Sequence, residues 1–414
     1  MRAQLWLVSY GLLGLTQNGL APILLPLMAG SESAAGLTYA AFALAGLSSP
    51  ALGTWADRTG RHRDLLIWGS LAAGALLLPY DIIPGPLRIL LAAGAGLGTM
   101  AAMTAGNVLA IQGRPKEEWD DHVARLQGFI SGGQVIGLLC AGLLIRSRPG
   151  FGFVAAGLAL VAAAGLAACF APGRLPRHPS DKPIAAPARG GDAGVPAVHH
   201  HGHHFGLGEL RSYLGVIEPP LWRFLAIWLI AYPAMNGIAT LFPVAMTRQF
   251  GMDPIWPSAA YALGVMISLA AYGPVGTATH RQGGGRMLMA GLGLRLVLLA
   301  ALSAFSLMKT EWAAAVVLLG FALTQVVWPL LSVAANSLAV HLAPEARGES
   351  VGLFNAATSL ASSVGSALAG VIFGQWGFAG LSALACLMVG AALILSGYWL
   401  PARGLARTGS ERTR

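Results

Sequence analysis

The sequence predicts an all-α membrane protein whose twelve transmembrane helices form two pseudo-symmetric six-helix bundles. Three observations predict this fold: an apolar composition, long apolar runs in two groups of six, and short motifs that recur in both groups. Of the 414 residues, 55% are hydrophobic and 10% are charged, and the mean hydropathy is +0.64. Soluble proteins carry about 25% charged residues, so this surface is predicted to face lipid and a soluble enzyme is excluded.

The apolar runs are long enough to cross a bilayer, whose hydrocarbon core of about 30 Å takes about 20 helical residues. They lie at 4–28, 37–56, 65–80, 87–112, 124–145, 151–171, 221–247, 256–278, 287–307, 312–341, 350–373 and 377–400. The third run is the weakest, because it is short and ends at Pro79. The first run is too long for a signal-peptide core, and we expect it to stay in the mature protein.

Lysine and arginine placement predicts the orientation, since cytoplasmic loops are enriched in both. With a cytoplasmic amino terminus, the outer side keeps only Arg88, Arg146, Arg148, Arg248 and Lys309. We therefore expect a multi-pass protein of the cell membrane with both termini and the middle loop in the cytoplasm. The net charge of +9 is interpreted as topology-setting charge, and no nucleic-acid partner is expected.

The predicted domains follow from this pattern. Residues 1–171 form an N-terminal bundle, 172–220 a cytoplasmic linker rich in proline and histidine, 221–400 a C-terminal bundle, and 401–414 a basic cytoplasmic tail. The linker carries a histidine run made of His199, His200, His201, His203 and His204. Clustered imidazoles bind Ni²⁺, Cu²⁺ or Zn²⁺. The alternative is that the run arose by sequence drift in a low-complexity loop that tolerates change. The predicted spans lack the cysteine, histidine and carboxylate ligands that a metal path needs.

Three local motifs of the first half return in the second half in the same order. The matched pairs are Asn18–Ala21 with Asn236–Ala239, Gly53–Arg63 with Gly276–Arg286, and Ala105–Ala110 with Ala334–Ala339. Pro115 and Pro344 follow the last pair at the same distance. Parallel repeats of this kind are typical of transporters whose site lies between two halves.

At these residues the chain resembles the major facilitator superfamily, and the resemblance covers essentially its whole length. The Gly53–Arg63 segment is similar to the family's cytoplasmic loop between helices two and three, with Trp55 where leucine is usual. The segment 344–355 is similar to the start of the family's helix eleven. The resemblance implies transport by rocking of the two halves around a central cavity.

The resemblance also implies a conformational latch on the cytoplasmic side. Its residues would be Gly53, Asp57, Arg58, Gly60, Arg61, Arg347 and Gly348. A carboxylate at Asp57 would be stabilised by the positive end of the helix that begins near Gly348. The alternative is that this turn only sets topology and that its glycines are turn residues.

The cavity is expected between helices one, four, seven and ten, with help from two, five, eight and eleven. Its polar and aromatic candidates are Gln17, Asn18, Asn107, Gln112, Gln134, Tyr232, Asn236, Tyr261, Gln325, Trp328, Asn336 and Asn355. Uncharged amides and aromatics suit a neutral or amphipathic organic solute. The repeated asparagines serve equally well as hydrogen-bonding ties between helices.

Arg295 is the charged residue that falls inside a predicted span, in helix nine. An intramembrane arginine suggests binding of an anionic substrate. The opposing interpretation is favoured here: helix nine is peripheral in the resembled family, and an arginine at this depth can extend its guanidinium to the interface.

The sequence therefore predicts a secondary transporter that moves a small organic solute by alternating access, with export favoured and no cofactor. One alternative is a divalent-metal exporter that uses the histidine run, and another is a non-transporting scaffold or receptor on the same fold. All seventeen acidic residues fall in predicted loops or at span ends, so a coupling proton is left open. A monomer is expected.

Overall fold

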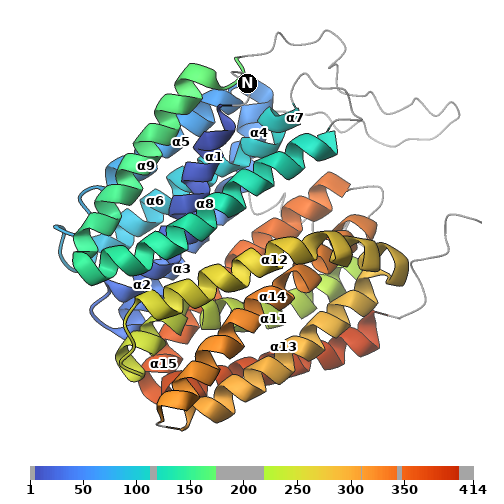
Figure 1. Ribbon diagram of the computed structural model, residues 1–414. Helices are drawn as coiled ribbons and strands as arrows, with labels where there is room; N and C mark the ends of the chain where they lie inside the picture. The colour runs from blue at the N-terminus through green and yellow to red at the C-terminus, as the bar shows by residue number, and fades with distance from the viewer. Residues whose placement is uncertain (1–4, 112–118, 174–218, 309, 343–346, 401–414) are drawn as a thin grey trace, which may run out of the picture.

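The computed structural model describes residues 5–111, 119–173, 219–308, 310–342 and 347–400. Within these ranges the chain is helical and contains no strand. Figure 1 shows the first half, blue to green, beside the second half, yellow to red. The predicted 172–220 linker and the 401–414 tail lie almost entirely outside the described residues.

The first half runs from the amino terminus to residue 173. Its elements are α1 (Leu7–Gly14), η2 (Leu15–Leu20), α2 (Ala21–Leu27), α3 (Glu32–Leu44), η3 (Ala45–Ser48), α4 (Ser49–Thr59), α5 (His62–Leu77), α6 (Leu87–Thr104), α7 (Gly106–Ile111), α8 (Trp119–Ser147) and α9 (Pro149–Phe170). The start of α3 is capped by Ser31, whose Oγ accepts a hydrogen bond from the Ala34 amide at 3.2 Å. Such a cap satisfies an amide that has no partner within the helix.

The second half contains fewer but longer elements. They are α11 (Pro219–Val244), η5 (Ala245–Gln249), α12 (Ile255–Gln282), α13 (Gly284–Ser306), α14 (Glu311–His341) and α15 (Arg347–Trp399). Gly377 interrupts α15 with a φ of 65°, a conformation that glycine adopts without strain. This break falls where the sequence predicts the boundary between the last two spans.

Nine helices among the described residues are long and apolar enough to cross a membrane. The twelve expected spans are consistent with this number. Helix α15 covers the last two expected spans. The first expected span is divided at η2, and the third corresponds to α5, which has only 16 residues. The sequence thus places the spans well, while their count depends on how broken helices are divided.

The sequence predicts a turn over Gly53–Arg63, but in the structure the turn is shorter and begins only after Thr59. Helix α4 continues through Gly53 to Thr59, and the chain reverses only at Gly60, which has a φ of 66°. In the second half Gly283, with a φ of 87°, takes the same place between α12 and α13. Gly53 is therefore a helical residue, and only Gly60 supplies the left-handed backbone that ends the helix.

Each half has its own apolar core, one built mainly on α1–α9 and the other mainly on α11–α15. Close helix crossings within the halves depend on glycine. A Cβ atom at Gly133 of α8 would lie 1.8 Å from the carbonyl oxygen of Gly11 in α1. A Cβ at Gly365 of α15 would lie 2.3 Å from the carbonyl oxygen of Pro233 in α11. Small residues let helices approach closely where burial in lipid supplies no driving force.

The two halves contact each other mainly through α3 with α15 and α8 with α12. Close cross-half contacts, such as Gly36 with Gly370 and Gly142 with Ile255, lie toward one end of the molecule. We call it the ion-pair end because the pairs Arg248–Glu32 and Arg146–Asp253 both join the halves there. The opposite end, which carries Gly60 and Gly283, is called the turn end. Ser363 of α15 adds a cross-half bond, since its Oγ donates to the Ala40 carbonyl at 2.9 Å.

The two ion pairs are expected to contribute little to closure of the ion-pair end. Arg248 Nη1 lies 3.3 Å from Glu32 Oε1, and Arg146 Nε lies 3.5 Å from Asp253 Oδ2, with all four side chains partly exposed. We expect Arg146→Gln, which removes only the pair with Asp253, to lower the free energy of unfolding by about 0.2–1 kcal/mol, and by less in high salt. Thermal unfolding of both proteins at low and high salt measures this. A loss above about 2 kcal/mol would contradict the screened-pair estimate.

Candidate functional site

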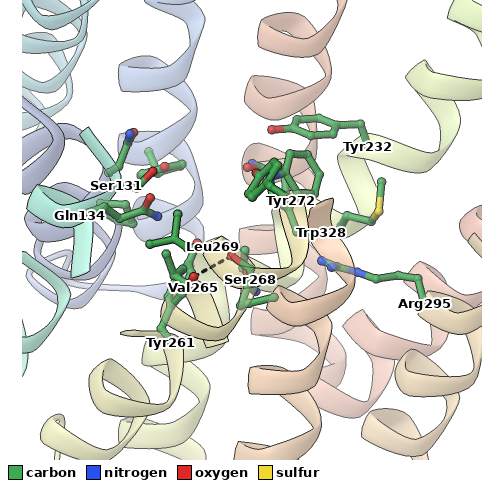
Figure 2. Close-up of a pocket in the computed structure, with 17 residues that line it drawn as sticks. Ser131, Gln134, Tyr232, Tyr261, Val265, Ser268, Leu269, Tyr272, Arg295 and Trp328 are labelled. Atoms are coloured by element: carbon green, nitrogen blue, oxygen red, sulfur yellow. Dashed lines mark hydrogen bonds between the residues drawn. The ribbon is translucent and has the colours of Figure 1, made fainter. Parts of the chain in front are cut away.

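A cavity of about 290 Å³ lies between the two halves, and its wall combines amides, hydroxyls and aromatic rings. The first half supplies residues from η2, α2, α3 and α8, and the second half supplies residues from α11, α12, α13 and α14 (Figure 2). The wall consists of Asn18, Pro22, Tyr39, Ser131, Gln134, Tyr232, Met235, Asn236, Ala239, Tyr261, Val265, Ser268, Leu269, Tyr272, Arg295, Gln325 and Trp328.

The cavity brings together most of the residues that the sequence proposes for it. Those that line it are Asn18, Gln134, Tyr232, Asn236, Tyr261, Gln325 and Trp328. Gln17 faces another way and donates from Nε2 to Met100 Sδ at 3.1 Å. Asn336 and Asn355 are exposed and do not line this cavity, and Asn336 Nδ2 donates to the Ser332 carbonyl of its own helix at 2.8 Å. The side chains of Asn107 and Gln112 lie outside the described residues.

Asn236 acts as a tie between helices as well as a wall residue. Its Nδ2 donates to the Ser366 Oγ at 2.8 Å and to the Ser362 carbonyl at 3.0 Å, both on α15. Asn18, its counterpart in the sequence repeat, also lines the cavity. The duplicated positions thus share a place in the two halves, and for Asn236 the hydrogen-bonding interpretation has direct geometric support.

The second half gives the cavity an aromatic wall. The Tyr232 ring lies 5.9 Å from Trp328, and Trp228, which is buried behind them, lies 5.2 Å from Tyr232 and 6.4 Å from Trp328. The Trp228 Nε1 donates to Thr358 Oγ1 at 2.9 Å, which fixes the orientation of its ring. Tyr261 packs edge-on against Phe321 at 5.2 Å. A planar apolar group can stack against this wall.

The favoured sequence interpretation expected Arg295 to extend to the membrane interface. The structure instead places it in the wall of the cavity. The residue is 3% exposed and its Nη1 donates to the Thr324 carbonyl on α14. In Figure 2 its side chain extends from α13 toward the other labelled wall residues. The arginine side chain is long enough to reach the cavity from α13, and the Thr324 carbonyl of α14 holds its guanidinium there. The expectation of an uncharged cavity is therefore corrected.

Several wall residues were not among the sequence candidates, including Tyr39, Ser131, Ser268 and Tyr272. Ser131 precedes the predicted Gln134 by three residues, which is one helical turn, so a fixed register for α8 would have found it. Tyr272 follows Tyr261 by eleven residues, or three turns of α12, and also lies on the same face. Tyr39 has no such sequence signal, since it reaches the cavity from a helix that mainly joins the two halves.

The latch residues are only partly described. Gly53 lies within α4, Gly60 ends that helix, and the exposed Arg61 has its Nε 4.0 Å from Asp64 Oδ2. The side chains of Asp57, Arg58 and Arg347, and the surroundings of Gly348, lie outside the described residues. Helices α4 and α15 contact each other, and the latch itself stays a prediction.

The metal alternative rests on residues that the structure does not describe, because the run from His199 to His204 lies in the 174–218 gap. Within the described ranges, no group of three or more histidine, cysteine or carboxylate side chains could hold a metal ion. Cys140, Cys169 and Cys386 are free thiols.

Comparison with known proteins identifies the family. The sequence profile of the Major Facilitator Superfamily matches residues 6–346, and no curated protein matches the chain significantly. Among solved structures, the nucleoside transporter NupG has a TM-score of 0.70 at 11% identity, covering 97% of this chain and 98% of its own. A bacterial homologue of the iron transporter ferroportin, inward-facing, has a TM-score of 0.67 at 15% identity, covering 96% of both chains.

A third solved structure is a bacterial homologue of the human lysosomal transporter Spinster, inward-facing and occupied. Its TM-score is 0.70 at 14% identity, and the match covers 96% of this chain and 95% of its own. At these identities the structures share the fold alone, whereas the profile match extends over most of the sequence. The chain belongs to the Major Facilitator Superfamily and is a multi-pass membrane protein, a secondary transporter of a small-molecule substrate.

Proposed function

We propose that the protein moves a small organic solute across the cell membrane by alternating access between its two bundles. The observation that carries this proposal is the place of the cavity: both halves line it, and close contacts between them lie toward the ion-pair end. A cavity built this way becomes accessible from one side or the other when the halves rock. The bias of lysine and arginine puts the turn end in the cytoplasm, so this state faces inward.

Export is the direction that the wall chemistry favours. An amphipathic solute that stacks on Trp328 and Tyr232 can also dissolve in lipid, as a neutral molecule or as the protonated form of an acid, and enter a cell unaided. A carrier for such a solute therefore has more effect outward than inward. The coupling ion and the monomeric state remain part of the proposal, and Asp57 and the histidines are the groups through which a proton could act.

A reversible cross-link tests alternating access directly. A Cβ built at Gly374 lies 3.7 Å from the Glu32 Cβ across the two halves, close to the usual separation of about 3.8 Å in a disulfide. We expect Glu32→Cys with Gly374→Cys, made in a chain without its three native cysteines, to lock the ion-pair end when oxidised. In proteoliposomes, mass spectrometry of a mixed solute pool should show uptake that stops on oxidation and returns on reduction.

The single Gly374→Cys variant is the control, because it carries one thiol and cannot form the bridge. A scaffold or receptor would take up no solute in either redox state, and that result would overturn the transport proposal. A variant that lacks residues 198–204 addresses the metal alternative. If only divalent metals raise the melting temperature, and only with those residues present, the organic-solute assignment is wrong.

A further inference from the structure

Arg295 is a buried cation without a counter-charge among the residues that the structure describes. Its Nη1 donates to the Thr324 carbonyl, but its Nε is buried and has no hydrogen-bond partner. No ion pair of the described residues includes it. The wall of the cavity contains no acidic residue, and the sequence keeps its carboxylates in loops or at span ends.

Such a charge is costly to keep. Moving an ion out of water costs several kcal/mol even after the surroundings relax, and a partner with good geometry must offset that cost. A purely structural residue at this position would be better served by an apolar side chain of similar volume. An arginine that is held in place by Thr324 and left open toward a cavity is instead arranged to receive an anion.

The surroundings of Arg295 define the anion further. Tyr232 and Tyr261 line the same cavity as Arg295, and their hydroxyls take part in no hydrogen bond among the described residues. These phenols are donors, as is Gln325 beside them. A planar guanidinium fork matches a carboxylate in a bidentate arrangement better than a spherical ion.

The rest of the cavity sets the size and the apolar part of the solute. Trp328 and Tyr232 form an aromatic wall near the cation, and Met235 and Leu269 add apolar surface. A volume of about 290 Å³ admits a molecule with one or two rings. The first half adds Asn18, Ser131 and Gln134, which can bond a polar group at the other end.

We propose that Arg295 is the anion-binding residue of the transport cavity and that the substrate is a small aromatic carboxylate. The carboxylate binds the guanidinium with help from the phenol hydroxyls of Tyr232 and Tyr261, and the ring stacks on Trp328. This inference rests on the proposed transport function and names the substrate class for it.

The test compares matched acids and amides on purified protein in detergent. The probes are benzoate, phenylacetate and indole-3-acetate, each beside its neutral amide, with chloride and sulfate as inorganic anions. Melting temperature is measured against probe concentration for the unmodified protein, Arg295→Met, Arg295→Lys and the control Arg286→Gln. Arg286 is exposed at the start of the same helix.

We expect at least one acid to raise the melting temperature in a dose-dependent way, with little effect from its amide or from the inorganic anions. Arg295→Met should lower the affinity for that acid about tenfold to a hundredfold, since a hydrogen bond to a charged group contributes about 1.5–3 kcal/mol. Arg295→Lys should be intermediate and Arg286→Gln unchanged. Without any probe, Arg295→Met should melt at a higher temperature than the unmodified protein.

Three results would overturn the inference: no acid acting better than its amide, shifts that persist in Arg295→Met, or equal shifts with chloride or sulfate. A lower melting temperature of probe-free Arg295→Met would assign Arg295 a structural role. Failure of the transport proposal is seen separately. If the proteoliposomes take up a neutral solute and Arg295→Met takes it up equally, transport stands and the carboxylate assignment fails.

Discussion

Alanine at Gly133 is expected to prevent stable folding, whereas alanine at the adjacent Gly132 is expected to be harmless. A Cβ at Gly133 would lie 1.8 Å from the Gly11 carbonyl oxygen and 2.9 Å from the Leu15 amide nitrogen. Both are backbone atoms, which cannot turn aside as a side chain would. Overpacking of a tight contact costs about 1–3 kcal/mol and occasionally more, and this contact is closer than any real Cβ approaches.

Gly132 is the matched control because it belongs to the same helix, and nothing lies within 4 Å of a Cβ built there. Alanine has the higher helix propensity by about 0.8–1.0 kcal/mol, so Gly132→Ala should be neutral or slightly stabilising. Size-exclusion profiles and melting temperatures of the two variants in detergent give the comparison. Equal stability of Gly133→Ala and Gly132→Ala would mean that α1 and α8 do not cross as closely as described.

The second large effect is expected at Gly370, where alanine should open the ion-pair end without unfolding either half. A Cβ at Gly370 of α15 would lie 2.6 Å from the Glu32 carbonyl oxygen and 3.0 Å from the Gly36 Cα of α3. These contacts join the halves, so the clash is relieved by separating them instead of disrupting a core. A penalty of about 1–3 kcal/mol on the closed state shifts the equilibrium by about fivefold to 150-fold.

Gly374, one turn further along α15, serves as the control. A Cβ there lies 3.7 Å from the Glu32 Cβ, which is ordinary contact, so Gly374→Ala should leave closure unchanged. Spin labels on cysteines at Ile82 and Leu307, which are 82% and 72% exposed, report the separation of the halves at this end. The label distance should lengthen in Gly370→Ala alone. An unchanged distance in both variants would show that this crossing does not govern closure.

The sequence predicted the helices well because lipid imposes a simple rule on the chain. Each span must be apolar for about 20 residues, and this length can be counted directly. The limit appears at Gly53, which looks like a turn residue beside Gly60 but lies within α4. Apolar patterning marks where a span crosses lipid, whereas the end of a helix depends on which glycine takes a positive φ.

The cavity was harder to predict, because a wall residue is chosen by rotation about the helix axis. Successive helical residues point about 100° apart, so the sequence alone does not tell that Gln325 lines the cavity while Asn336, on the same helix, does not. Arg295 shows a second limit. Its depth could be counted, but the direction of a long side chain depends on Thr324, a neighbour brought close by tertiary packing.

If Arg295 binds a carboxylate as proposed, its buried charge would also make the transport cycle sensitive to the membrane voltage. With the proposed orientation the cavity is at the cytoplasmic potential, and the voltage falls across the closed ion-pair end. A negative cell interior therefore stabilises the empty, positively charged carrier in this state, by up to about 2.3 kcal/mol per 100 mV. A bound carboxylate would cancel the charge of Arg295, so reorientation of the loaded carrier would move no net charge across the membrane. In the proposed cycle, each turnover would move one negative charge outward, so a negative cell interior would favour export of the carboxylate.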